Sequence, residues 1–231
     1  GMVAVLSVVW LMSLLLLRQE LGVMKAKPKF SHIFSKSEAV NRLSLARLFL
    51  CGARDVWFVV ALPVFLHEVL GWDFWQVGGY LAAWVMIYGM IQAAAPKLTG
   101  RSQASDVVGR QLVVFGGCLA LTPAAIGLAL SYGLSPVFVV TVGLLIFALL
   151  FAMNSALHSF LIVRFARDEG ASLDIGFYYM ANAGGRLAGT IGSGALYQWM
   201  GLEACLWVSA GLIAMASLAA MSLPKGEVGT A

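Results

Sequence analysis

The sequence predicts an all-α polytopic membrane protein from its composition, the length of its apolar runs and the placement of its basic residues. Of its 231 residues, 61% are hydrophobic and 11% are charged, and the mean hydropathy is +0.88. Soluble domains carry about 25% charged residues. Runs of about 20 apolar residues, enough for a spanning helix, recur along the chain. Stretches such as "VSAGLIAMASLAAMSL" lack the alternating polarity of membrane-barrel strands. We therefore expect the chain to cross a lipid bilayer as a series of helices.

Seven apolar runs predict about seven transmembrane helices and leave almost no residues for a soluble domain. The first run lacks the basic leader and the small-residue cleavage site of a secretory signal, which predicts a true membrane helix. The predicted spans are Met2–Leu17, Leu43–Leu66, Phe74–Pro96, Gln111–Gly133, Pro136–Val163, Phe177–Met200 and Glu203–Leu223.

Basic residues set the predicted orientation, because lysine and arginine concentrate in short cytoplasmic loops. Three alternate loops, "HEVLGWD", "YGLSP" and "WMGLE", contain neither residue type. We expect the first helix to begin outside and the C-terminal tail, 224–231, to lie in the cytoplasm. The net charge of +4 is then a topology signal rather than a nucleic-acid footprint. The basic residues on the predicted cytoplasmic side are Arg18, Lys25, Lys27, Lys29, Lys36, Arg42, Lys97, Arg101, Arg110, Arg164, Arg167 and Lys225.

The predicted domains are one helix, a basic linker and a six-helix bundle. The helix covers 1–17, the cytoplasmic linker 18–42 and the bundle 43–223. This arrangement is expected if a twelve-helix transporter is divided just before its sixth helix. Gly1 would then be a boundary inside a longer protein, and the N-terminal half would be the partner of this bundle.

Local signals predict where helices begin and bend. Ser35 followed by Glu38 has the spacing of a capping box, so we expect the second helix to begin near Lys36. Pro63 and Pro123 lie inside predicted spans, where proline kinks a helix and neighbouring groups satisfy the freed backbone.

The six-helix block divides into two sets of three helices with opposite topology, which resembles the nested inverted repeats of major facilitator transporters. The middle helices of the two sets, 74–96 and 177–200, are rich in glycine. Gly185 and Gly189 have the GxxxG spacing that lets membrane helices approach closely. The alternative is that these glycines reflect only the general abundance of glycine in membrane helices.

The sequence contains no nucleotide-binding loop, catalytic triad or metal-ligand cluster, so we expect no enzyme, no cofactor and no metal site. "GGRLAG" resembles a dinucleotide loop only superficially, because no strand precedes it. Cys51, Cys118 and Cys205 are odd in number and all lie in predicted spans. They are interpreted as small apolar packing residues.

Two arginines at membrane depth are the main candidates for function. In "LFLCGARDVWFVVALPVFL", Arg54 and Asp55 are adjacent at mid-span, where a charge costs about 2.5 to 3.5 kcal/mol. Arg186 lies near the middle of another span. Guanidinium groups pair bidentately with phosphate-like and carboxylate oxygens, which predicts a site for a multiply charged anion. Residues spaced by three or four share a helix face. One such polar face lies on the span 177–200 and consists of Tyr178, Asn182, Arg186, Thr190, Ser193 and Tyr197. The other lies on the span 74–96 and consists of Gln76, Tyr80, Trp84, Tyr88 and Gln92.

The predicted substrate-binding set and its alternatives follow from these faces. A membrane arginine is alternatively structural, paired with Asp55 or capping broken backbone. Adjacent side chains project about 100° apart, so a pair within one helix is not expected. Asp55 and His158 are the coupling candidates; Asp55 is alternatively part of a structural ion pair, and His158, which shares a face with Asn154, is alternatively a packing histidine. The predicted substrate-binding residues are Arg54, Arg186, Tyr80, Trp84, Tyr88, Tyr178 and Asn182.

Two stretches, "GARDVWFVVALPVFLHEVLGW" and "DIGFYYMANAGGRLAGTIGSGALYQWMG", resemble the ArsJ organoarsenical efflux permeases of the major facilitator superfamily. The resemblance covers nearly the whole chain as the C-terminal half of such a permease. It implies a multi-pass protein of the bacterial inner membrane that exports 1-arseno-3-phosphoglycerate. A glyceraldehyde-3-phosphate dehydrogenase makes this substrate, so a functional link to that enzyme is implied. The departure from the family pattern is the missing N-terminal half.

The expected function is therefore secondary active export of a small anionic organoarsenical, driven by proton antiport, giving arsenate resistance. A second hypothesis keeps the fold and changes the cargo to another organic anion, a sugar phosphate or a drug. A third hypothesis is a seven-helix membrane protein that does not transport, such as an assembly factor or a receptor.

Overall fold

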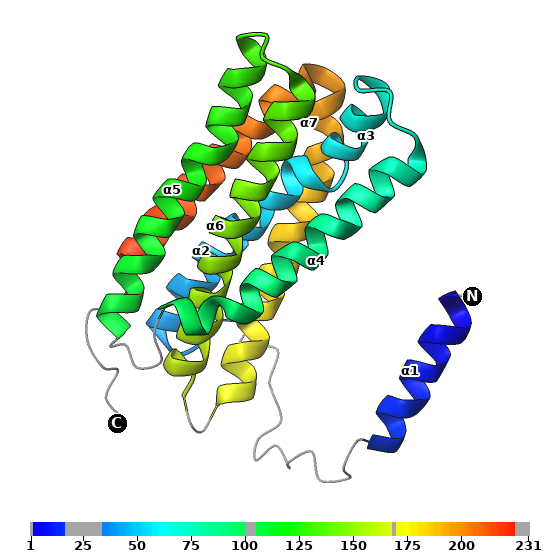
Figure 1. The fold of residues 1–231 in the computed structure, drawn as a ribbon. Coiled ribbons are helices and arrows are strands. Elements are labelled where there is room, and N and C mark those ends of the chain that lie inside the picture. Colours follow the sequence, from blue (N-terminus) through cyan, green and yellow to red (C-terminus); the bar gives the residue numbers. More distant parts are fainter. Residues whose placement is uncertain (1, 17–33, 100–104, 168–169, 225–231) are drawn as a thin grey trace. The chain divides into compact units, whose positions relative to one another are not determined.

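The computed structural model describes residues 2–16, 34–99, 105–167 and 170–224, and every regular element in these ranges is a helix (Figure 1). The chain divides into two units, Gly1–His32 and Ile33–Ala231. The described part of the first unit is α1, Met2–Leu16, whose 15 residues fall short of the roughly 20 that span a bilayer. Most of the predicted linker lies outside the described residues.

The second unit contains five helical stretches that are long and apolar enough to cross a membrane, counted over the described residues. Their lengths follow the apolar runs, because a helix satisfies its own backbone where no water is present. The elements are α2 (Glu38–Phe58), α3 (Ala61–Glu68), α4 (Phe74–Thr99), α5 (Ser105–Ser131), α6 (Pro136–Phe165) and α7 (Ala171–Met221); α2 and α3 together make one stretch.

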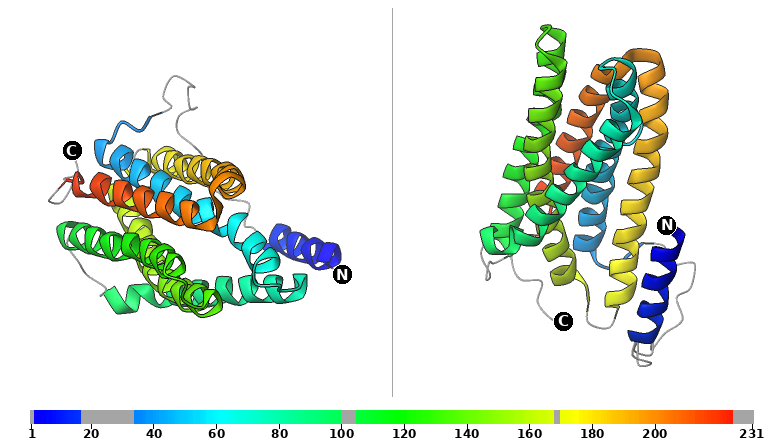
Figure 2. Two further views of the ribbon diagram at one scale, coloured as in Figure 1. Left: turned by 90° about the horizontal axis from the view of Figure 1, so that it is seen from above. Right: turned by 45° about the vertical axis from the view of Figure 1, so that its right-hand side comes forward.

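Helix α7 turns back on itself at Gly201. Its 51 residues would extend about 76 Å if straight, more than twice the roughly 30 Å of a bilayer core. Gly201 leaves the helical region with φ 76° and ψ −172°, a conformation that glycine adopts without a steric penalty. Figure 2 shows the yellow arm and the red arm running in opposite directions from this turn. The spans predicted over 177–200 and 203–223 are these two arms.

The span predicted over 43–66 is broken rather than continuous. Helix α2 ends at Phe58, and α3 begins at Ala61. Pro63 has no N–H to donate to the Val59 carbonyl, and its ring crowds that carbonyl. The Ala61 N–H donates instead to Ser193 Oγ in α7, at 3.0 Å. The kink expected at Pro63 is thus a break capped from another helix.

Glycines bring the backbones of α2 and α7 into contact. A methyl group added at Gly185 would lie 2.9 Å from the Leu48 carbonyl carbon, and one at Gly189 would lie 2.5 Å from the Gly52 carbonyl oxygen. Close approach through Gly185 and Gly189 is therefore confirmed. Gly184, which precedes Gly185 in sequence, has no such role, because a methyl group there would meet nothing within 4 Å.

The start of α2 differs from the prediction. Ser37, not Ser35, is the N-cap, and its hydroxyl accepts from the Val40 N–H at 3.4 Å. Ser35 donates instead to Asp174 Oδ1 in α7, at 2.6 Å. The capping box predicted for Ser35 and Glu38 is wrong, because the Ser35 hydroxyl oxygen accepts from the Ser37 N–H at 3.0 Å and the Ser35 N–H donates to Asn41 Oδ1 at 3.0 Å.

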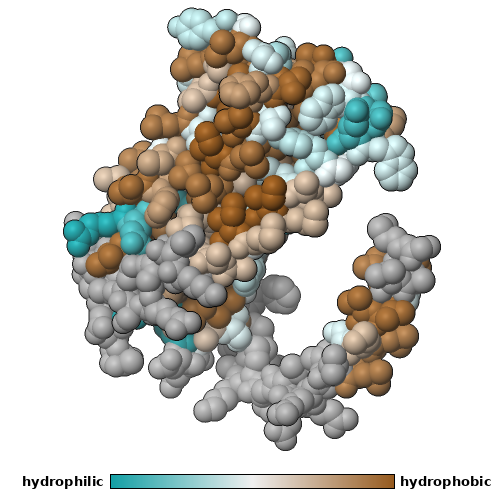
Figure 3. Space-filling model, in the orientation of Figure 1, coloured by the Kyte–Doolittle hydropathy of each residue, from teal (hydrophilic) through white to brown (hydrophobic). Residues whose placement is uncertain are grey.

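Helix α2 packs mainly on α7. It packs against both arms of α7, while α5 packs on α7 and α6, and α4 packs mainly on α6. One buried cluster centres on Trp57, Phe147 and Phe151 near the α2–α3 break. The face shown in Figure 3 is largely apolar over the coloured part of these helices, which suits a bilayer.

Candidate functional site

Asp55 binds both predicted arginines. Its Oδ1 accepts from Arg54 Nε at 2.6 Å, and its Oδ2 accepts from Arg186 Nε at 3.0 Å. The expectation that adjacent residues would not pair within one helix is wrong, because the long Arg54 side chain folds back toward its neighbour. The Asp55 side chain is 1% exposed, whereas those of Arg54 and Arg186 are 18% and 56% exposed. The carboxylate is thus buried beneath two guanidinium groups.

This trio carries a net positive charge on a membrane-spanning face. Two arginines and one aspartate sum to +1. A charge facing hydrocarbon at mid-span costs several kcal/mol even on lenient scales, and such residues line bundle interiors or aqueous cavities. The exposed side of Arg186 therefore belongs against water, an anion or protein rather than lipid.

A third arginine, Arg47, belongs to the same cluster and was missed by the sequence analysis. Its Nε donates to Asn182 Oδ1 at 3.2 Å, and its Nη1 donates to Ser155 Oγ at 2.9 Å. Its guanidinium carbon lies 5.7 Å from the centre of the Tyr178 ring. The available signal was spacing, since Arg47 and Arg54 are seven residues apart and share a helix face.

Asn182 links α7 to α2 within this cluster. Its Oδ1 accepts from Arg47 and also from the Cys51 thiol, at 2.7 Å. Cys51 therefore makes a polar contact that the prediction of an apolar packing residue omitted. Cys51 and Cys205 are buried, as the packing interpretation expects, whereas Cys118 is exposed on its helix, so that interpretation is wrong for Cys118.

Aromatic rings surround the other side of Arg54. Its guanidinium carbon lies 5.5 Å from the Phe151 ring centre, and Tyr88 lies 5.8 Å from Phe151. The Trp84 ring stacks on the Tyr88 ring, with 5.6 Å between their centres. The Trp84 ring centre also lies 4.4 Å from that of Phe58, which follows Arg54 by one helical turn. These rings offer an apolar and cation-binding wall beside the guanidinium.

The predicted face on α4 serves partly structural roles. Trp84 is buried and donates its indole N–H to the Leu144 carbonyl at 2.8 Å, so it anchors α4 to α6. Gln76 exchanges hydrogen bonds with Asp73 at the start of α4, in a capping arrangement. Tyr80 packs edge-on against Trp72, two turns from Tyr88. Of this face, Tyr88 is the residue that packs against Phe151, the ring beside Arg54.

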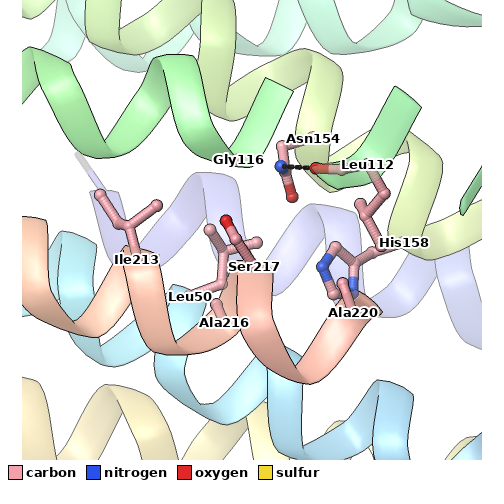
Figure 4. Close-up of a pocket in the computed structure, with 9 residues that line it drawn as sticks. All are labelled: Leu50, Leu112, Gly116, Asn154, His158, Ile213, Ala216, Ser217 and Ala220. Carbon is pink, nitrogen blue, oxygen red and sulfur yellow. Dashed lines mark hydrogen bonds between the residues drawn. The ribbon is translucent and has the colours of Figure 1, made fainter. Parts of the chain in front are cut away.

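His158 lies one turn from Ser155, the partner of Arg47, and faces a small space between α2, α5, α6 and α7 that none of the three arginines lines (Figure 4). It is 2% exposed, and its Nδ1 has no hydrogen-bond partner among the described residues. Its neighbour Asn154 donates to the Leu112 carbonyl at 3.2 Å. Ser217 from α7 faces the same space, which has no room for a water molecule. This environment resembles that of a packing histidine.

A larger cavity of about 570 Å³ lies between α2 and the first arm of α7, and it includes neither Arg54 nor Arg186. Its lining is mostly apolar and includes Leu45, Leu48 and Met180. No group of three or more histidine, cysteine, aspartate or glutamate side chains is arranged to hold a metal ion within the described ranges.

Comparison with known proteins adds no assignment to this geometry. No protein-family model matches the chain, and no curated protein matches it significantly. The arginine cluster therefore has to be interpreted from its own chemistry.

Proposed function

We propose that this chain is part of a secondary transporter that exports a small organic anion. The observation that carries the proposal is the Arg54–Asp55–Arg186 trio, in which two guanidinium groups share one buried carboxylate. An incoming anion supplies the negative charge that the trio lacks. Arg54 and Arg186 are proposed to bind its oxygens, with Tyr88, Tyr178 and Asn182 around them.

The proposed architecture is one half of a major facilitator transporter, with seven membrane helices in this chain and an N-terminal half as partner. The first three stretches of the bundle, α2–α3, α4 and α5, alternate in direction, and α6 with the two arms of α7 alternates in the opposite sense. The packing of α4 on α6 has its counterpart in the packing of the first arm of α7 on α2. These relations support, at the level of arrangement, an inverted 3+3 repeat.

The proposed substrate is 1-arseno-3-phosphoglycerate, on the basis of the resemblance to ArsJ permeases. An arsenate ester and a phosphate ester suit arginines that bind anionic oxygens bidentately. Export by proton antiport would use Asp55, which is buried and central; His158 is the second coupling candidate. The proposed location is the bacterial inner membrane with the C-terminus in the cytoplasm. Another organic anion, a sugar phosphate or a drug is the alternative cargo.

The test is arsenic uptake into inside-out vesicles that contain the full-length permease. Glyceraldehyde-3-phosphate dehydrogenase, arsenate and glyceraldehyde 3-phosphate generate the substrate in place. We expect arsenic to accumulate only when the dehydrogenase is present, and accumulation to fall at least about tenfold in Arg54→Gln and Arg186→Gln, since a bond to a charged group contributes about 1.5 to 3 kcal/mol.

Arg42→Gln is the matched control, because Arg42 lies on the same helix and pairs with Glu38 near its exposed start. It is expected to transport as the parent does. If folded parent protein takes up no arsenic, the arsenical is not the substrate, and phosphorylated sugars would be tested next. If both arginine variants take up arsenic normally, Arg54 and Arg186 do not form the substrate site.

A further inference from the structure

Arg47 differs from the other two clustered arginines because it has no carboxylate partner. Its hydrogen bonds go to the neutral oxygens of Asn182 and Ser155, and it forms no ion pair within the described part of the chain. It is partly buried on a membrane-spanning helix, where an uncompensated charge is unfavourable. A residue placed in this way needs a negative charge from outside the chain's own side chains.

The three guanidinium groups converge on one region of α2 and α7. Asn182, which binds Arg47, lies one turn from Arg186 on the same helix, about 6 Å in rise. The Cys51 thiol lies close enough to Arg47, Arg54, Asp55 and Arg186 to interact electrostatically with all four. The four charged groups therefore act on a common volume around Cys51.

We infer that Arg47 is a third anion-binding residue and that it makes the site select a doubly charged anion over a singly charged one. The inference rests on the proposed function. Three arginines and one aspartate give the cluster a formal charge of +2, which a dianion neutralises and a monoanion leaves half compensated. Asn182 and Ser155 hold the guanidinium in place with neutral oxygens, so its charge remains available to the ligand.

The experiment measures inhibition of transport by two matched competitors in vesicles containing the full-length permease. Methyl phosphate is mostly a dianion above its second pKa of about 6, whereas dimethyl phosphate is a monoanion at every pH used. The readout is the ratio of their inhibition constants, which does not depend on the amount of folded protein. The parent is expected to favour the dianion at least about tenfold, and Arg47→Gln to lose most of this preference.

Ser155→Asp tests the same point without removing Arg47. It places a carboxylate beside the guanidinium, at the position where Ser155 Oγ now accepts at 2.9 Å, and should neutralise it. Ser155→Asn has nearly the same size and no charge. We expect the dianion preference to fall about tenfold further in Ser155→Asp than in Ser155→Asn, and Arg42→Gln to behave as the parent does.

The outcomes separate the two proposals. If the parent transports, and both Arg47→Gln and Ser155→Asp keep the parent's ratio, Arg47 is structural and the inference is wrong while the proposed function stands. If Arg47→Gln does not fold, the Ser155 pair decides alone. If neither phosphate nor any other anion inhibits transport by the parent, the proposed anion site, and with it the proposed function, is wrong.

Discussion

Asp55 holds Arg54 and Arg186 through one carboxylate, and this sharing makes the three residues interdependent. Removing a buried ion-pair partner leaves the other charge uncompensated, which costs more than the pair itself stabilises. Here two cations would be left at once, next to a third, Arg47. Asp55 is therefore a structural requirement of the cluster, whatever part it plays in proton coupling.

We expect Asp55→Asn to destabilise the protein by about 3 to 5 kcal/mol, and to lower Tm in detergent by roughly 10 °C, because two guanidinium groups lose their counter-ion. The double variant Asp55→Asn, Arg186→Gln should be more stable than the sum of the two single changes predicts. Thermal unfolding of all three variants gives the coupling. Strict additivity would show that Asp55 and Arg186 do not interact.

Helices α2 and α7 are joined by direct backbone contact as well as by side-chain hydrogen bonds. Gly52, Gly185 and Gly189 allow this approach, and the Ser209 hydroxyl adds a 2.7 Å hydrogen bond to the Ala53 carbonyl from the second arm of α7. Small residues at such crossings gain packing contacts that lipid does not offer. The arginine cluster depends on this pair, because its charged residues come from these two helices.

Adjacent glycines provide a matched test of this contact. Gly185→Ala would place a methyl group against the Leu48 backbone, and overpacking of this kind costs about 1 to 3 kcal/mol. Gly184→Ala meets open space and should be neutral or slightly stabilising, since alanine favours helix. We expect Tm to fall in the first variant only. Equal Tm values for the two variants would contradict a close crossing of the helices at Gly185.

A second link joins the α6–α7 connection to the start of α2. Asp174 is buried and accepts from Arg167 Nε at 2.9 Å, from Arg167 Nη2 at 3.0 Å and from Ser35. These hydrogen bonds raise the pKa of Arg167 above its ordinary value, so it stays charged at any pH the protein tolerates. The link is therefore independent of pH across the neutral range.

Asp174→Asn should weaken this link and lower the free energy of unfolding by about 2 kcal/mol, since the bonds from Arg167 lose a charged acceptor. Limited proteolysis between α6 and α7 should also be faster. Leu173→Ala, at an exposed position in the same turn, serves as a control for local disturbance. Unchanged proteolysis in Asp174→Asn would show that the link does not restrain this connection.

The two ends of the second unit differ in their content of basic residues. The connections after α3 and α5 and the turn at Gly201 lie at one end, which is the upper end of the second unit in Figure 1. Arg110 and Arg164 belong to the opposite end. Because basic residues are retained in the cytoplasm, the end that carries the arginines is expected to face the cytoplasm.

Single cysteines test this orientation. With the three native cysteines replaced, Ser135→Cys should react with a membrane-impermeant maleimide on intact cells, because Ser135 is exposed in the α5–α6 connection. Ser222→Cys, exposed at the end of α7, should react only after permeabilisation. The reverse labelling pattern would invert the proposed topology.

The helices could be predicted from sequence because each apolar run determines its own backbone structure in lipid. Gly185 and Gly189 were predictable for a similar reason, since their spacing is local. The bridging role of Asp55 was not, because its second partner is 131 residues away in sequence. Arg47 was missed because its partners, Asn182 and Ser155, are set by helix packing. Ser37 is the cap in place of Ser35 because Ser35 folds into other hydrogen bonds, with the Ser37 N–H, Asn41 and the distant Asp174.

The glycine contact between α2 and α7 also has a mechanical consequence. Two helices that touch through their backbones cannot slide past each other by exchanging side-chain rotamers, so along this crossing they behave as one rigid body. Arg54, Asp55 and Arg186 all belong to these two helices. Any motion that opens or closes the region around them must therefore come from rotation of the arginine side chains or from displacement of α4 and α6 against this rigid body.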